Sequence, residues 1–144
     1  MSSSRFDIKH FDELTTRELY DLLHLRDEVF VVGQKITAVP EVDGLDVECA
    51  HVRAFLDERL VGTARIFVDH DPLVVGRVAV HPDLQRSGMG TLMMQFVGNW
   101  LGERPAELHA QAYLEPWYAR IGWETFGEPF DEADIPHVMM RWKS

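Results

Sequence analysis

The sequence predicts an α/β (α+β) fold in which helices cover a central β-sheet. Three observations predict it: a hairpin pattern over residues 49–68, an apolar run at Leu73–Val80, and a helical period at Met89–Leu101. The chain has 144 residues, 46% of them hydrophobic, which is the usual size of one domain with one core. We therefore expect a single domain over residues 1–144.

The first helix is expected over residues 16–32. Thr15 and Glu18 have the spacing of a capping box, and apolar residues then recur at helical spacing as far as Phe30. Residues 33–46 are rich in Gly, Pro and Asp and show no period, which predicts a loop. A loop of this length in a small domain usually has a function.

The strands of the hairpin come next. Alternating side chains predict a strand over residues 49–56, and the turn residues 57–59 join it to a second strand over residues 60–68. After a break, the run Leu73–Val80 is so apolar that we expect it at the centre of the sheet, buried on both faces. Gly76 within this run indicates a β-bulge nearby.

The helix over Met89–Leu101 repeats apolar residues at i, i+3, i+4 and i+7, and Gly102 stands where a C-cap is expected. The elements expected after it are a strand over residues 107–112, a short helix over residues 115–121, and strands over residues 123–126 and 138–142. The last strand could be covered, or it could form an edge used by a partner such as a second copy in a homodimer.

Composition restricts the partners. Asp and Glu outnumber Lys and Arg by 24 to 14, a formal net charge of −10 that repels nucleic acid. Cys49 is the single cysteine, so we expect no disulfide, no bound metal and a reducing, cytoplasmic location. Residues 1–10 lack a signal-peptide pattern, and no apolar run approaches the roughly 20 residues of a membrane helix, so we expect no membrane partner.

The first chemical signal lies between the central strand and the helix that follows. Gly88 and Gly90 stand at the helix start, where unpaired backbone N–H groups can bind an anion such as a pyrophosphate. A tight connection without a ligand could carry the same glycines. The P-loop pattern is absent, and its missing lysine argues against a protein that binds ATP with this loop.

Four signals together resemble the GNAT N-acetyltransferase superfamily. They are the order of the elements, the exit Val80-His81-Pro82, the pattern [RQ]-x-x-G-x-[GA] met by Gln85, Gly88 and Gly90, and the segment Trp117-Tyr118-x-x-x-Gly122-Trp123. The chain also resembles the ElaA-like branch of that superfamily over nearly its whole length. The segments that carry this second similarity are residues 19–23, Arg26, residues 29–32, Gln34, residues 76–78, residues 110–112 and residues 135–137.

Two positions depart from these patterns. Gly33 stands where ElaA-like sequences commonly have Glu, which removes an acidic contact to the substrate at that position. Trp123 stands where the superfamily commonly has Phe, a change that conserves packing. Neither residue belongs to the glycine loop.

The resemblance implies the GNAT fold, a mixed and mostly antiparallel sheet of about six to seven strands flanked by about four helices. Two splayed central strands would form a groove for acetyl-CoA, the cosubstrate, whose pantetheine arm would pair with the strand Leu73–Val80. A free N–H group near Ala79 could stabilise an oxyanion. The residues expected to contact the coenzyme are Val78, Ala79, Val80, Gln85, Arg86, Ser87, Gly88, Met89, Gly90, Thr91 and Tyr118.

The resemblance also implies catalytic roles. Tyr118 matches the tyrosine that protonates the departing thiolate, although Tyr118 could be only part of the buried face of a short helix. A base is needed because an alkyl amine, with a pKa of about 10.4, is almost fully protonated at neutral pH. His51 and His137 have suitable intrinsic pKa values, while Asp43 and other loop carboxylates could act through water.

The acceptor is described less fully by the sequence. Phe30 and Arg77 match ElaA-like positions and are expected to face an acceptor pocket together with Asp43. The acidic loop predicts a cationic acceptor, a small-molecule or peptide amine, and leaves open whether an acyl group other than acetyl is preferred. The alternative to an enzyme is a non-catalytic acyl-CoA-binding or regulatory module. The carboxylates of the acidic loop that predict a cationic acceptor are Glu41, Asp43, Asp46 and Glu48.

Overall fold

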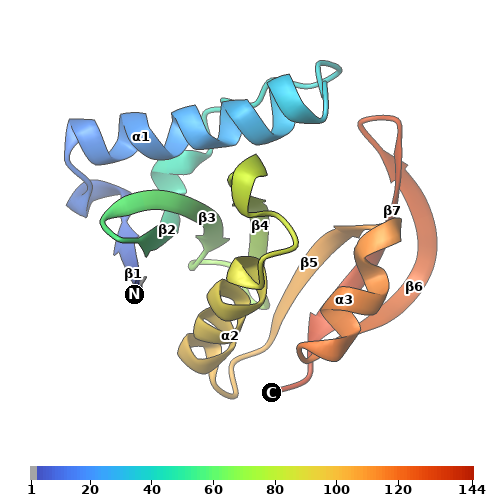
Figure 1. The fold of residues 1–144 in the computed structure, drawn as a ribbon. Helices are drawn as coiled ribbons and strands as arrows, with labels where there is room; N and C mark the ends of the chain where they lie inside the picture. Colours follow the sequence, from blue (N-terminus) through green and yellow to red (C-terminus); the bar gives the residue numbers. More distant parts are fainter. Residues whose placement is uncertain (1–2) are drawn as a thin grey trace.

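A seven-stranded sheet in the order β1-β2-β3-β4-β5-β7-β6 forms the centre of the computed structural model, which describes residues 3–144. Residues 1 and 2 of the expected domain lie outside the described residues. Every neighbouring pair of strands is antiparallel except β4 and β5, which are parallel. The expected mixed, mostly antiparallel sheet is therefore confirmed, and Figure 1 shows its arrangement.

Most elements lie close to their predicted bounds. The strands are β1 (Ser4–His10), β2 (Cys49–Leu56), β3 (Arg59–Phe67), β4 (Leu73–Val80), β5 (Ala106–Gln111), β6 (Trp123–Glu132) and β7 (Ile135–Trp142). The helices are α1 (Thr16–Arg26), continued by a π-helix (Asp27–Gly33), then α2 (Met89–Leu101) and α3 (Glu115–Arg120). The described residues thus hold three α-helices and not about four, because the other helical segments are the π-helix that continues α1 and short 3₁₀ turns.

The start of α1 has the predicted capping box. The Thr15 hydroxyl accepts from the Glu18 N–H at 3.1 Å, and the Glu18 carboxylate accepts from the Thr15 N–H at 2.8 Å. The helix then widens, and the Gln34 N–H donates to the Val29 carbonyl five residues earlier. Such π-helical turns are often found at functional sites.

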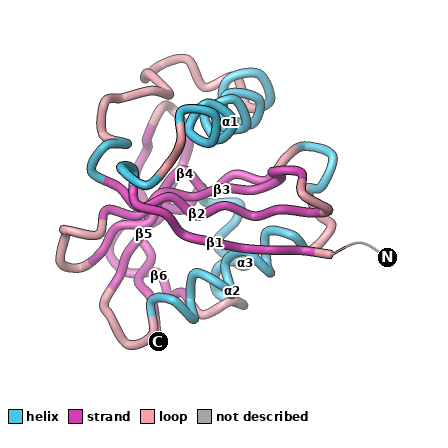
Figure 2. Tube along the Cα trace, turned by 90° about the vertical axis from the view of Figure 1, so that its left-hand side faces the viewer, coloured by secondary structure: helices cyan, strands magenta, loops and turns pink. Residues whose placement is uncertain are grey.

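The two faces of the sheet are covered differently. Figure 2 shows α1 on one face, with α2 and α3 on the other. Against α2 and α3 the core is apolar and includes Ile66, Met93 and Trp123. Against α1 the buried side chains include several polar ones, among them Arg26 and Arg65. Within residues 3–144, no helix is long and apolar enough to cross a bilayer.

An irregularity in β4 shapes the centre of the sheet. The ladder between β3 and β4 shifts by one residue, so that Arg77 and Val78 together oppose Ala64. This is the bulge that Gly76 indicated, and it places Arg77 in the left-handed region at φ 49°. A non-glycine residue held in that region costs of order 1–3 kcal/mol, so the surrounding contacts must fix it.

The parallel pair β4 and β5 separates along its length. The strands are paired from Leu73 opposite Ala106 to Val75 opposite Leu108. Beyond that point β4 continues to Val80 with no ladder to β5 among the described residues. The expected splay of the two central strands is therefore present.

Candidate active site

The splay between β4 and β5 leaves two cavities. The larger, about 510 Å³, lies beside the start of α2 and beside α3, and we call it the helix groove. The smaller, about 130 Å³, lies between the π-helix, the loop after it and the β6–β7 hairpin, and we call it the hairpin cavity. The linings share Val78, Leu114 and Tyr118, so the two cavities meet at these three residues.

The glycine loop opens onto the helix groove. Gly88 caps α2 with φ 92°, a conformation in which a side chain would be strained. At Gly90 an added Cβ would lie 3.4 Å from both Trp117 and Val80, so the backbone approaches the groove closely. The N–H groups of four residues make no backbone hydrogen bond to any described residue and can bind an anion. These residues are Arg86, Gly88, Gly90 and Thr91.

Most residues predicted to contact the coenzyme line this groove, but three do not. The ones that line it are Val78, Val80, Gln85, Arg86, Gly88, Gly90, Thr91 and Tyr118. Met89 is buried in the apolar core. The Ser87 hydroxyl hydrogen-bonds to the Leu84 carbonyl and accepts from the Met89 N–H, so it holds the turn together. Ala79 is the third exception.

Backbone direction explains the position of Ala79. The His81 N–H donates to the Val61 carbonyl of β3 at 2.8 Å, and successive N–H groups of a strand point to opposite sides. Ala79, two residues earlier, therefore points its N–H toward β3. Val80 points toward the groove, where its carbonyl accepts from Gln85 at 3.1 Å. The N–H of Ala79 itself is therefore directed away from the groove, and the free N–H expected near Ala79 belongs to a neighbouring residue of β4.

Tyr118 lies where the two cavities meet. Its side chain is 5% exposed and packs edge-on against Trp117, with ring centroids 4.7 Å apart. The Trp117 indole N–H donates to the Thr91 hydroxyl at 2.9 Å, which ties α3 to α2. Burial, and to a smaller extent Tyr113, raises the pKa of Tyr118 above its ordinary value. The phenol therefore stays protonated and can act as a proton donor.

The hairpin cavity contains two of the three predicted acceptor residues. Phe30 and Arg77 line it, whereas Asp43 does not. Asp43 is paired instead with Arg65 at 2.7 Å and with Arg77 at 3.4 Å. The hydrogen bond from Arg65 lowers the pKa of Asp43 far below its usual range. Asp43 thus contacts Arg77, a residue of the cavity wall, without lining the cavity itself.

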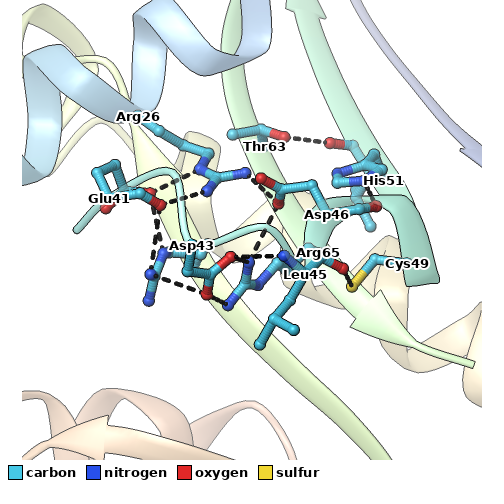
Figure 3. A network of polar contacts seen from close by, with 11 residues as sticks. Arg26, Glu41, Asp43, Leu45, Asp46, Cys49, His51, Thr63 and Arg65 are labelled. Atoms are coloured by element: carbon cyan, nitrogen blue, oxygen red, sulfur yellow. Dashed lines mark hydrogen bonds and ion pairs between the residues drawn. The ribbon is translucent and has the colours of Figure 1, made fainter. Parts of the chain in front are cut away.

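The loop carboxylates are mostly compensated by arginines, as Figure 3 shows. Arg26, on α1, binds Glu41 at 2.8 Å and Asp46 at 2.7 Å. Burial would raise the pKa of Asp46, but Arg26 and Arg65 lower it below its usual value. We call this set the arginine–carboxylate network. Its members are Arg26, Glu41, Asp43, Asp46, Arg65 and Arg77.

Charge pairing in the network changes what the acidic loop can do. Three of the four carboxylates that suggested a cationic acceptor face guanidinium groups, and none of the four lines the hairpin cavity. Glu48 is exposed. The field of this loop therefore does not support an acceptor preference, and its carboxylates hold the loop against the sheet.

The two candidate bases lie in different surroundings. His51 is completely buried on β2, and its Nε2 lies 2.9 Å from the Asp46 carbonyl oxygen. Burial lowers the pKa of His51, and its ring lines neither cavity. A substrate therefore has no access to this ring, and the geometry does not favour His51 as the base. His137, on β7, lines the hairpin cavity.

Two side chains beside His137 had not been singled out in the sequence. Glu132, at the end of β6, lies 3.6 Å from His137 Nε2 and 2.8 Å from His109 Nδ1. The hydrogen bond between His109 and Glu132 raises the pKa of His109 and lowers the pKa of Glu132. All three side chains line the hairpin cavity. The helix groove likewise has lining residues that were not predicted, and these are Gln34, Leu84, Tyr113, Leu114 and Trp117.

Known proteins with similar sequences and structures place the chain in a family. The family model described as an acetyltransferase (GNAT) domain matches residues 45–144. A UPF0039 protein of Schizosaccharomyces pombe is 37% identical over 98% of this chain and 98% of its own length. An acyl-CoA N-acyltransferase structure from Pseudomonas aeruginosa has a TM-score of 0.86 and 36% identity, covering 96% of this chain and 99% of that one. The structure of Escherichia coli ElaA has a TM-score of 0.86 and 32% identity, covering 97% and 99%. The chain therefore belongs to the GNAT acetyltransferase family, in its ElaA-like branch.

Proposed function

We propose that this protein transfers the acetyl group of acetyl-CoA to a primary amine by direct attack in a ternary complex. Membership of the GNAT family supports an N-acetyltransferase type of enzyme. Transfer from acetyl-CoA to an amine is supported by one observation above all, that the helix groove and the hairpin cavity meet at Tyr118. Two substrates bound side by side would bring their reacting atoms together beside this phenol.

The helix groove fits the coenzyme. The free N–H groups at the start of α2 suit its pyrophosphate, and the unpaired edge of β4 at Val80 suits an amide of its pantetheine arm. Gly88 and Gly90 allow that approach because neither carries a side chain. When bound, acetyl-CoA supplies the thioester carbonyl that an amine attacks.

The residues at the junction can carry the chemistry. A β-bulge leaves one residue out of the ladder, so the bulge at Arg77 and Val78 offers a backbone N–H donor to the carbonyl oxygen. Of the three protons on the acceptor ammonium, one passes to His137, one stays on the amide nitrogen, and one passes through Tyr118 to the departing sulfur. The C–N bond forms as the C–S bond breaks, and Tyr118 ends protonated as it began.

The hairpin cavity limits the acceptor. At about 130 Å³ it admits a small amine or the amine end of a longer molecule. Part of its wall is apolar, formed by Phe30, Ile36 and Val39. The acceptor that we propose is a primary amine on a short apolar stem, either a small molecule or a peptide.

Purified protein tests this proposal. Acetyl-CoA is incubated with a panel of alkyl amines, amino acids and short peptides, and thiol release is measured beside mass detection of the products. We expect thiol release that depends on an amine, with the mass of one acetyl group added to that amine. Tight binding of acetyl-CoA without transfer to any member would favour a non-catalytic acyl-CoA-binding module, and binding of ATP in the same groove would favour a nucleotide-binding protein.

A further inference from the structure

A histidine nitrogen and a carboxylate oxygen face one another in the wall of the hairpin cavity. His137 Nδ1 lies 2.7 Å from the Ile135 carbonyl oxygen, which can only accept, so a neutral His137 carries its proton on Nδ1. The lone pair is therefore on Nε2, which lies 3.6 Å from Glu132 Oε2. A carboxylate oxygen is also an acceptor only, so with a neutral His137 neither atom donates to the other, and a ligand that carries N–H donors can bridge the two.

The orientation of the pair is fixed by its neighbours. His109 Nδ1 donates to Glu132 Oε1 at 2.8 Å, which leaves Oε2 directed at His137. Phe130 stacks on His137 with centroids 5.9 Å apart and meets His109 edge-on at 5.1 Å. Within residues 3–144, no three His, Cys, Asp or Glu side chains gather as metal ligands would, and His109, Glu132 and His137 are no exception.

The other charged groups around Glu132 do not engage Oε2. Arg77 of β4 lines the same cavity and contributes to lowering the pKa of Glu132, but its Nε binds Glu41 at 2.9 Å. Glu107 of β5 acts on His109 and helps to raise the pKa of that imidazole. Tyr118 of α3 is a neutral phenol because burial raises its pKa. Glu132 therefore remains ionised, with one oxygen available to a cation.

We propose that Glu132 Oε2 and His137 Nε2 together bind the ammonium group of the acceptor, and that His137 then removes one of its protons. This inference rests on the proposed acetyl transfer. An ammonium group has three N–H donors and can bridge both acceptors, and its attraction to the carboxylate is charge-assisted. Glu132 is a positioning residue that also stabilises the imidazolium after the proton moves. The half-exposed Glu132 then lets His137 release that proton to water.

A pair of probe amines separates this role from a structural one. Ethylamine is an ammonium ion at about pH 7.5, whereas 2,2,2-trifluoroethylamine has nearly the same shape and is mostly neutral there. Glu132→Gln should lower kcat/KM for ethylamine by about tenfold or more, the usual size of a charge-assisted hydrogen bond, and leave the KM for acetyl-CoA unchanged. For the fluorinated amine the loss should be less than about threefold, because no ammonium needs to be bound or deprotonated.

Asp131→Asn is the matched control, because Asp131 is exposed, adjacent on β6 and makes no ion pair with any described residue. It should behave as the wild type with both amines. Nitrogen NMR of the wild type should show His137 as the Nδ1–H tautomer, a measurement that does not depend on turnover. Equal losses for both amines in Glu132→Gln, or an Nε2–H tautomer, would overturn the ammonium site alone. A wild-type protein that acetylates no amine would overturn the proposed function itself.

Discussion

The two cavities are built from different kinds of sequence. The helix groove is formed largely by one continuous stretch, from the end of β4 through the glycine loop to the first turn of α2, with α3 added. The hairpin cavity collects residues from the π-helix, the loop after it, β4, β5 and the β6–β7 hairpin. A short motif can therefore specify the groove, whereas only the folded sheet assembles the cavity.

The two cavities also differ in the groups that they offer to a charged ligand. The helix groove offers backbone N–H groups, which serve any anion and depend little on side-chain identity. The hairpin cavity offers imidazoles, one carboxylate and one guanidinium, whose charges depend on distant partners. Coenzyme binding should therefore tolerate most side-chain changes, while acceptor binding should be sensitive to single charges.

The largest expected effect concerns the network behind the hairpin cavity. Asp46→Ala leaves the buried guanidinium groups of Arg26 and Arg65 without their shared carboxylate, at 2.7 Å and 3.1 Å. Breaking a buried pair from one side costs about 3–5 kcal/mol, so urea unfolding should show a loss of that order. Glu48→Ala, an exposed change in the same segment, should leave the free energy of unfolding within about 0.5 kcal/mol.

The same network predicts how stability depends on pH. The folded-state pKa of Asp46 lies below its unfolded value of about 3.9, so its contribution is complete above that pH and is lost as pH falls further. The free energy of unfolding should therefore fall less steeply with decreasing pH in Asp46→Ala than in the wild type. Equal stability of Asp46→Ala and the wild type at neutral pH would show that the network does not hold the cavity wall.

The next effect concerns the junction. Tyr118→Phe removes the proposed proton donor and should lower kcat by about 100-fold or more, with little change in acetyl-CoA affinity. Tyr20→Phe, at an exposed position on α1, is the control and should leave both kcat and the affinity for acetyl-CoA unchanged. Because burial raises the pKa of Tyr118, wild-type turnover should persist past the ordinary tyrosine value of about 10 before the phenol ionises. Full turnover of Tyr118→Phe with chemistry rate-limiting would remove the phenol from the mechanism.

The smallest of these effects concerns the helix groove. At Gly90 a Cβ lies 3.4 Å from Trp117 and Val80, a distance that a methyl group can occupy, while a branched side chain must displace them. Gly90→Val should therefore weaken acetyl-CoA binding about tenfold in calorimetry, and Gly90→Ala should weaken it much less. A native far-UV spectrum for both variants excludes unfolding as the cause. If Val and Ala bind equally well, the groove at Gly90 is not the coenzyme site.

Local signals explain how much of the fold could be predicted. The capping box at Thr15, the apolar β4 and the helical period of α2 all act through neighbours in sequence, and each lies where it was expected. β1 was missed because only the two apolar residues Phe6 and Ile8 alternate there before the chain turns. Its pairing with β2 supplies what the local pattern lacks.

The strand β6 shows where a local rule failed. The predicted strand ends at Phe126, just before Gly127-Glu128-Pro129, yet β6 resumes at Phe130 after a shift in register with β7. Proline is tolerated because β6 is an edge strand and the residues lie in a bulge. This extension places Glu132 in the hairpin cavity, so the missed strand and the missed site residue have one cause.

The candidate site could be predicted only in part for the same reason. Gly88, Gly90 and Tyr118 lie in motifs that are continuous in sequence, and all three line the helix groove. The burial of His51 and the pairing of Asp43 with Arg65 depend on contacts between residues far apart in the chain. No spacing in the sequence reports such contacts.

Steady-state kinetics distinguish direct transfer at the junction of the two cavities from transfer through an acetylated protein. Initial velocities are measured with acetyl-CoA and ethylamine, or the best amine of the panel, both varied. Because the cavities meet at Tyr118, both substrates must be bound before transfer, and double-reciprocal plots should intersect. Parallel lines, together with an acetylated protein detected by mass spectrometry when the amine is left out, would contradict direct transfer.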